Sequence, residues 1–245
     1  IVEKINNVDV APVLISNDAT AYNNLIGAST AGITNVFLFK KPDGTEVTIS
    51  STKASFKVNS VIVYDTLHYS NNKVTGHLVF DSFIQPSTDE LATAFAYFKS
   101  VGVNDLILDL RYNTGGYLYV AQALASYIAG NSLAGKQDYF ATLTYNSKHQ
   151  DQNTSYIFQS TPSPLDLTRL VVISSRLTAS ASEAVMNGLK PFLDVVSVGD
   201  TTYGKPVGMN GWSVGEKYFY WPITFKMVNA ANVGDYFAGL PPLKI

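Results

Sequence analysis

The residues best suited to chemistry are a serine and a lysine 25 positions apart, Ser180 and Lys205. Ser180 stands in residues 178–183 (Thr-Ala-Ser-Ala-Ser-Glu), where small neighbours leave its hydroxyl accessible. Lys205 stands between a glycine and a proline. A serine hydroxyl becomes a nucleophile when a base removes its proton, and a lysine amine can be that base once burial favours its neutral form. The pair therefore predicts nucleophilic catalysis.

A second element of such chemistry is the glycine pair Gly115 and Gly116, which follows an apolar run. Without Cβ atoms, their backbone N–H groups can approach an anionic oxygen closely. Each segment also fits a plain structural role. The glycine pair fits a tight turn, Ser180 fits a helix N-cap, and Lys205 fits a solvated surface lysine.

Positioning these residues requires strands that alternate with helices. The apolar runs 77–80, 106–110, 170–173 and 195–198 predict strands, and helices are expected after Pro86, over 117–129 and over 181–190. For the first helix we expect a capping box, with Ser87 as the N-cap and Glu90 three residues later. Such alternation predicts an α/β fold around a mainly parallel sheet. The strand 195–198 should lie beside 170–173, which would return Lys205 to the edge that carries Ser180.

The chain divides by composition into two predicted domains, 1–58 and 59–245. In the first, apolar runs 36–39 and 46–49 flank Pro42-Asp43-Gly44, which is typical of a hairpin, and residues 20–27 predict a short helix that ends on glycine. This domain is expected to be a small β-rich module. In the second, residues 131–168 are polar and are expected to form an irregular excursion such as a lid.

Composition excludes several classes of function. The 17 basic and 19 acidic residues give a net charge of −2, so nucleic acid is not an expected partner. The chain has no cysteine and three histidines, which argues against a metal site. It contains no apolar run long enough to span a bilayer. Because it opens without an initiator methionine or signal segment, we expect it to be a piece of a longer precursor.

Taken together, residues 109–116, residues 178–183 and the Gly-Lys-Pro turn resemble the S41 family of serine peptidases, the C-terminal processing proteases. Residues 140–149 and 202–210 are most similar to a branch of this family that is common in Bacteroidetes. The resemblance implies Ser180 as the nucleophile and Lys205 as the general base. It also implies an oxyanion hole made by the N–H of Ala181 and that of Gly115 or Gly116. The implied fold is a crotonase/ClpP-like α/β protease core, with the later part of a PDZ-like module at residues 1–58.

The sequence departs from the family pattern four residues after the lysine, where many members have a glutamine and this chain has Met209. The amide of Asn210 or a backbone carbonyl could orient the Lys205 amine instead. Two further residues are candidates for supporting roles. Tyr203 could pack over the stem of Lys205 or be a plain core tyrosine, and Glu183 could polarise the site or simply stabilise the first turn of its helix.

The resemblance implies a serine endopeptidase that needs no cofactor and cleaves polypeptides near C-terminal or unstructured ends through an acyl-enzyme. It is also compatible with a homo-oligomer. A periplasmic or secreted location is expected, with attachment to the cell envelope through a preceding segment as a further possibility. One alternative is a catalytically inactive peptide-binding protein that keeps the fold. Another is a crotonase-like acyl-CoA enzyme, which would not explain the pairing of Ser180 with Lys205.

Overall fold

The computed structural model describes residues 1–136, 138–215 and 217–243. The chain separates into two compact units, Ile1–Val58 and Asn59–Ile245, which are described in turn.

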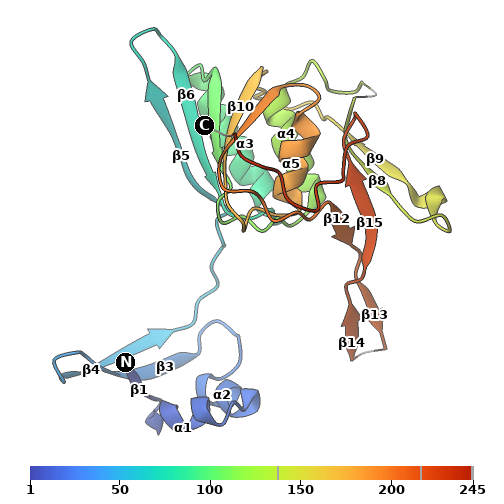
Figure 1. Ribbon diagram of the computed structural model, residues 1–245. Coiled ribbons are helices and arrows are strands. Elements are labelled where there is room, and N and C mark those ends of the chain that lie inside the picture. Colours follow the sequence, from blue (N-terminus) through green and yellow to red (C-terminus); the bar gives the residue numbers. More distant parts are fainter. Residues whose placement is uncertain (137, 216, 244–245) are drawn as a thin grey trace. The chain divides into compact units, whose positions relative to one another are not determined.

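The first unit is a four-stranded antiparallel sheet with two short helices (Figure 1). Its elements are β1 (Val2–Ile5), β2 (Val8–Asp9), α1 (Val10–Ile15), α2 (Ala19–Ile26), β3 (Thr34–Lys40) and β4 (Glu46–Thr52). The order is β2-β1-β3-β4, and β3 and β4 form the predicted hairpin. The predicted helix ends at Gly27, whose φ of 71° suits glycine. A small core of Ile5, Val10 and Leu25 holds the helices to the sheet.

The second unit is built on a five-stranded sheet of order β11-β10-β7-β6-β5. Its strands are β5 (Val61–His68), β6 (Val74–Phe80), β7 (Asp105–Asp109), β10 (Arg169–Ser174) and β11 (Asp194–Gly199). Only β5 is antiparallel to its neighbour among the strands of this sheet, which confirms the predicted mainly parallel sheet. β10 and β11 pair directly, as predicted, with Ser174 opposite Gly199. The two chain segments that carry Ser180 and Lys205 therefore leave the sheet side by side.

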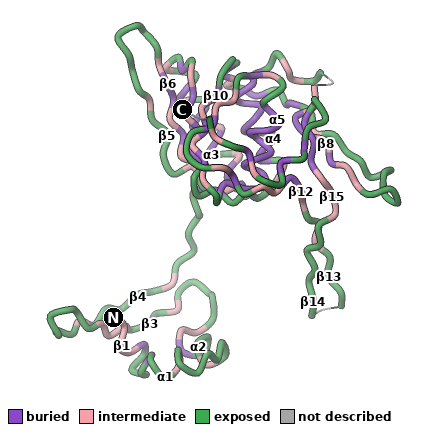
Figure 2. The backbone as a smooth tube through the Cα atoms, in the orientation of Figure 1, coloured by how far each residue is buried: buried purple, intermediate pink, exposed green. Residues whose placement is uncertain are grey.

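Three helices connect these strands: α3 (Ser87–Ser100), α4 (Leu118–Ala129) and α5 (Ala181–Leu189). Every residue of α5 is buried, because the helix packs against α4 and also against the strand β8 (Tyr139–Thr144) of a second sheet (Figure 2). A Cβ on Gly188 of α5 would lie 2.6 Å from the Phe140 carbonyl oxygen, so this contact requires glycine. The helix that begins next to Ser180 is therefore held from several sides.

The second sheet corrects one prediction. Residues 131–168 were expected to be irregular, but β8 and β9 (Thr154–Ile157) form a hairpin within them, with a short 3₁₀ turn (Gln150–Gln152) at its end. The sheet has the order β12-β15-β8-β9, with β12 (Val207–Met209) and β15 (Ile223–Val228). A smaller hairpin of β13 (Trp212–Val214) and β14 (Tyr218–Tyr220) extends from β12 and β15 (Figure 1).

The predicted capping box of α3 is wrong. Pro86 is the N-cap, and Ser87 is already helical. Glu90 does not reach back to the helix start; its Oε2 accepts hydrogen bonds from the backbone N–H groups of Ser60 and Val61 and from the Ser60 hydroxyl. The Glu90 carboxylate therefore makes a tertiary contact with residues 60–61 in place of the local capping-box hydrogen bond.

In the part of the chain that the structure describes, no helix is both long and apolar enough to cross a membrane.

Candidate active site

Ser180 lies where the loop after β10 turns into α5, in a backbone conformation that is rare for a residue with a side chain. Its φ is 56° and its ψ is −112°. Such a conformation costs on the order of 1–3 kcal/mol and persists only where the surroundings enforce it. The half-buried Ser180 is thus held at a sharp turn, directly before the N-terminus of a buried helix.

Glu183, which is fully buried, enforces this turn and also reaches the segment of Lys205. Its Oε2 accepts hydrogen bonds from the backbone N–H of Ser180 at 2.9 Å and from that of Lys205 at 2.8 Å. Its Oε1 accepts from the Thr202 hydroxyl at 2.6 Å and from the Gly204 N–H at 2.7 Å. Four donors therefore satisfy one buried carboxylate. The prediction that Glu183 stabilises its own first turn covers only part of this role.

The segment that carries Lys205 is tied to the serine loop by a further backbone contact. The Tyr203 N–H donates to the Thr178 carbonyl at 2.9 Å. On the other side, the Thr202 N–H donates to the Leu240 carbonyl, and the Leu240 N–H donates to the Thr202 hydroxyl. Residues 202–205 are consequently fixed between the serine loop and the C-terminal segment.

The glycine loop after β7 lies directly against Ser180. A Cβ on Gly115, whose φ is 103°, would lie 2.8 Å from the Ala179 carbonyl oxygen and 2.9 Å from the Ala181 nitrogen. Only glycine allows this approach. The Gly115 N–H donates to the Asn113 side chain at 2.9 Å, so it is not free to hold an oxyanion. Of the two glycines that the sequence left open, Gly116 is the one that lines the pocket described below.

Asn113 is a site residue that the sequence analysis missed. It is fully buried. Its Nδ2 donates to the Phe80 carbonyl at 2.9 Å, while its own carbonyl accepts from the Ala179 N–H and the Ser182 hydroxyl. One asparagine thus fixes the glycine loop to β6 and to the serine loop. Its place two residues before Gly115 was the available signal, since an asparagine side chain commonly bonds to the backbone two residues on.

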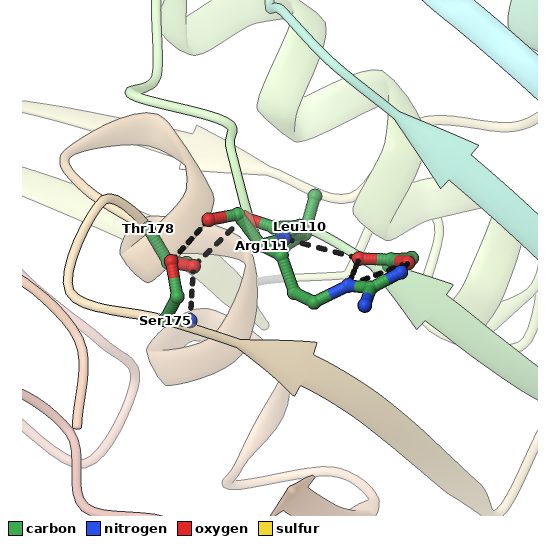
Figure 3. A network of polar contacts seen from close by, with 5 residues as sticks. Leu110, Arg111, Ser175 and Thr178 are labelled. Carbon is green, nitrogen blue, oxygen red and sulfur yellow. Dashed lines mark hydrogen bonds and ion pairs between the residues drawn. The ribbon is translucent and has the colours of Figure 1, made fainter. Parts of the chain in front are cut away.

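A second set of contacts joins the same two loops at their start (Figure 3). The buried Thr178 hydroxyl donates to the Leu110 carbonyl at 2.7 Å and accepts from the Ser175 N–H at 2.9 Å. The Ser175 hydroxyl donates to the Arg111 carbonyl. These hydrogen bonds therefore hold together the segments that follow β7 and β10, on the N-terminal side of Gly115 and Ser180.

The Arg111 side chain closes back on Asp109, the last residue of β7. The guanidinium contacts both carboxylate oxygens, with the Nη2 at 2.7 Å. Burial by itself raises the pKa of the Asp109 carboxyl, but the hydrogen bonds and the charge of Arg111 outweigh it and hold that pKa below its usual value. Asp109 is therefore a charged anchor of the strand end.

Ser180 and Lys205 line the same pocket, which has a volume of about 580 Å³. Gly116, Ala181, Met209 and Asn210 line it as well. The rest of its wall is mainly aromatic or apolar, with Phe83, Ile84, Tyr117, Leu118, Tyr119, Leu143, Tyr156, Trp221, Phe225 and Met227. Ala181 is the first residue of α5, so its N–H has no acceptor within the helix. Gly116 and Ala181, two of the residues predicted to form an oxyanion hole, thus both line the pocket of Ser180.

The remaining predicted supporting residues fall into two groups. Met209 and Asn210 line the pocket, and the Asn210 amide donates to the hydroxyls of Tyr145 and Thr224. In the described residues we find no hydrogen bond from either side chain to Lys205. Tyr203 is exposed and is not part of the pocket wall, so the expectation of a core tyrosine is wrong.

Tyr236 interacts electrostatically with Glu183. It is buried, and its hydroxyl has no hydrogen-bond partner among the described residues. Burial, together with the negative charge of Glu183, raises the pKa of Tyr236 well above its usual value. The tyrosine therefore stays neutral beside the carboxylate.

No group of three or more histidine, aspartate or glutamate side chains arranged to hold a metal ion is found in the described ranges.

The model of peptidase family S41 matches residues 74–226, which include the glycine loop, Ser180 and Lys205. The chain belongs to peptidase family S41. Members named as carboxyl-terminal processing proteases are among its relatives. One from Picosynechococcus sp. is 29% identical over 158 residues, and the carboxy-terminal processing protease CtpB of Bacillus subtilis is 26% identical over 165 residues. These matches span 64% and 62% of this chain but only 35% and 30% of the relatives.

Solved structures of S41 proteases share the fold of this chain. A putative S41 protease from Bacteroides fragilis has a TM-score of 0.70 at 25% identity, over 98% of this chain and 64% of that protein. A photosystem II D1 C-terminal processing protease has a TM-score of 0.60 at 18% identity, over 98% of this chain and 61% of that protein. The mixed α/β fold is therefore that of the S41 proteases.

Proposed function

We propose that the chain is the catalytic part of a serine endopeptidase in which Ser180 is the nucleophile and Lys205 the general base. The observation that carries the proposal is their shared pocket, together with the single Glu183 oxygen that accepts from both of their backbone amides. Family membership favours this reaction over the acyl-CoA chemistry of crotonase-like enzymes.

In the proposed reaction, Lys205 Nζ takes the proton of the Ser180 hydroxyl as Oγ attacks the peptide carbonyl carbon. The Gly116 and Ala181 N–H groups hold the negative charge that develops on the carbonyl oxygen. The Lys205 ammonium then gives its proton to the leaving amine, and the acyl group stays on Ser180. A water molecule, deprotonated by Lys205, attacks this ester; Lys205 then returns the proton to Ser180 Oγ, which releases the carboxylate product.

The proposed substrates are polypeptides, cut near C-terminal or unstructured ends. The carboxyl-terminal processing activity for which the relatives are named supports this choice, and so does the largely apolar pocket wall. We further propose that residues 1–58 are part of a PDZ-like module that binds peptide by adding it as a strand. Their antiparallel strands, with two short helices, support this. Self-association and an envelope location stay predictions from the family resemblance.

Digestion of an unfolded polypeptide, followed by mass spectrometry of the fragments, tests the proposal. We expect cleavage by the wild type and none by Ser180→Ala or Lys205→Ala. The matched controls Ser100→Ala and Lys73→Ala change an exposed serine and an exposed lysine outside the pocket, and they should cleave normally. Absence of cleavage by folded wild type, or cleavage by Ser180→Ala, would contradict it.

One observation favours the second candidate, an inactive peptide-binding protein. Met209 stands on the pocket wall where a glutamine is usual, and its thioether is at best a weak hydrogen-bond acceptor. If the folded wild type binds unfolded polypeptide but does not cleave it in the digestion assay, the second candidate replaces the first.

A further inference from the structure

The hairpin of β13 and β14, with the flanking Gly211 and Trp221, is called the arm from here on. Its large apolar side chains are all half exposed or more: Trp212, Val214, Tyr218, Phe219, Tyr220 and Trp221. Figure 2 shows both strands as exposed along their length. Six such residues on one short hairpin make a large apolar surface, of the kind that marks a binding site.

Both faces of the arm carry this surface. Trp212 pairs with Tyr220, and Val214 pairs with Tyr218, so these four side chains share one face. On the other face, the rings of Phe219 and Trp221 are in contact at 5.0 Å between centroids. The arm is a separate two-stranded sheet, so the outer edge of each strand lacks a strand partner among the described residues. A hairpin of two strands is marginally stable in water and gains from a third strand or an apolar cover.

The arm is continuous with the candidate active site. Gly211 and Trp221, at its base, line the pocket that also holds Ser180 and Lys205. β12 connects the Lys205 segment to the arm, and its Gly208 and Met209 line the same pocket. The arm's sequence contains two charged residues, Glu216 and Lys217, which follow one another between β13 and β14. A partner that covers β13 and β14 themselves therefore meets mainly aromatic and apolar side chains, on a surface that leads to Ser180.

From this continuity we infer that the arm binds the polypeptide substrate. This inference rests on the proposed function and narrows its substrate class to polypeptides with an extended apolar segment next to the cleaved bond. The backbone of that segment pairs with a free edge of β13 or β14, and its apolar side chains cover the aromatic rings. A lipid surface or a second copy of the chain could also cover apolar rings, but neither accounts for an arm whose base opens into the pocket of Ser180.

The tryptophans give a direct readout. The chain has two, Trp212 and Trp221, and both are in the arm, so tryptophan emission reports on the arm and on the part of the pocket wall that Trp221 forms. The probe is a 16-residue synthetic peptide in which Leu or Phe alternates with Thr, added to the Ser180→Ala variant so that nothing is cleaved. A peptide with every Leu and Phe replaced by Ser is the control. We expect a saturable blue shift of the emission with the apolar peptide and none with the serine peptide.

A variant with Tyr218→Ser and Tyr220→Ser should weaken this binding by about tenfold or more, which corresponds to about 1.4 kcal/mol. Tyr69→Ser, at a half-exposed tyrosine in the turn between β5 and β6, is the matched control and should bind as the parent does. Equal binding of both peptides, or of both variants, would overturn the inference. So would an emission shift that appears only with phosphatidylcholine vesicles, or only as the protein self-associates without peptide. Binding is measured in the Ser180→Ala variant, without cleavage. The test of the arm therefore gives a result even if the wild type proves to be catalytically inactive.

Discussion

The backbone amides of Ser180 and Lys205 donate to the same oxygen atom, Oε2 of Glu183. A nucleophile and its base must stay in register to within a fraction of an ångström for efficient proton transfer. In the proposed mechanism, the relative position of Ser180 and Lys205 is set through the main chain by the Glu183 carboxylate, which has no exposed surface. The side chains of Ser180 and Lys205 are thereby left to face the pocket.

Replacing Glu183 tests this arrangement. Glu183→Gln puts an NH₂ group, itself a donor, against N–H donors, so we expect a loss of about 3 kcal/mol in the free energy of unfolding. Misplacement of the pair should also lower kcat by about 100-fold. Glu90→Gln is the matched control, because Glu90 also accepts from two backbone amides and a serine hydroxyl, away from the pocket. Urea denaturation and peptide hydrolysis measure the two effects. If both variants lost stability but kept the same kcat, Glu183 would be purely structural.

Asn113→Ala should disturb the proposed oxyanion hole. The substitution leaves the Gly115 N–H and the Phe80 carbonyl without partners in a buried place, which should cost about 3 kcal/mol. We expect kcat to fall with little change in KM, because the oxyanion forms only in the transition state. Asn229→Ala is the control, since that buried asparagine also bridges backbone groups. A fall in kcat of the same size in both variants would argue against a specific role for Asn113.

Gly115→Ala should be far more damaging than the same change at Gly102. Both glycines have a positive φ, but a Cβ on Gly102 meets nothing within 4 Å, whereas one on Gly115 meets the serine loop. We expect Gly102→Ala to cost about 1 kcal/mol through backbone strain alone, and Gly115→Ala to abolish hydrolysis. Thermal unfolding and activity assays compare the two. Near-normal activity of Gly115→Ala would contradict the close approach of the two loops.

The charge of Asp109 should be visible in the pH dependence of stability. Its pKa is lowered in the folded state, so it stabilises the protein above its unfolded pKa of about 3.9, and this contribution is lost as the pH falls through the folded pKa. In Arg111→Met, the side-chain hydrogen bonds and the charge of Arg111 are lost while burial stays, so that pKa rises. The gap in unfolding free energy between wild type and variant should therefore be widest near pH 7 and close below about pH 4. Arg176→Met, which removes an exposed pair with Asp200, should show a smaller gap. A gap for Arg111→Met that does not change with pH would contradict this account.

The sequence predicted the parts of the fold that local patterns control. Apolar runs were enough to predict the parallel strands, and Gly130 and Pro191 marked the ends of α4 and α5. The β8–β9 hairpin was missed because many of its residues are polar. The pairing of β8 with β9 and with β15 identifies it as part of a sheet, and these pairings depend on the tertiary structure. Ser87 was misread because Glu90, its supposed partner, is taken by Ser60, 30 positions away.

The same distinction applies to the site. Ser180 and Lys205 could be proposed as nucleophile and base from residue type and spacing; the structure places both on one pocket, and their roles stay predictions. The choice of Gly116 over Gly115 could not, because it depends on a hydrogen bond from Gly115 to Asn113. The second function of Glu183 depends on contacts with residues 202–205, which only the packed structure brings together.

The most direct test of the central claim is covalent labelling with a fluorophosphonate, followed by mapping of the modified residue by mass spectrometry. We predict a single adduct on Ser180, formed about 100-fold or more slowly in Lys205→Ala, because a positioned base contributes a factor of that order. Lys73→Ala should label as fast as the wild type. No adduct on Ser180 in the folded protein, or equal rates with and without Lys205, would contradict the claim that these two side chains act together.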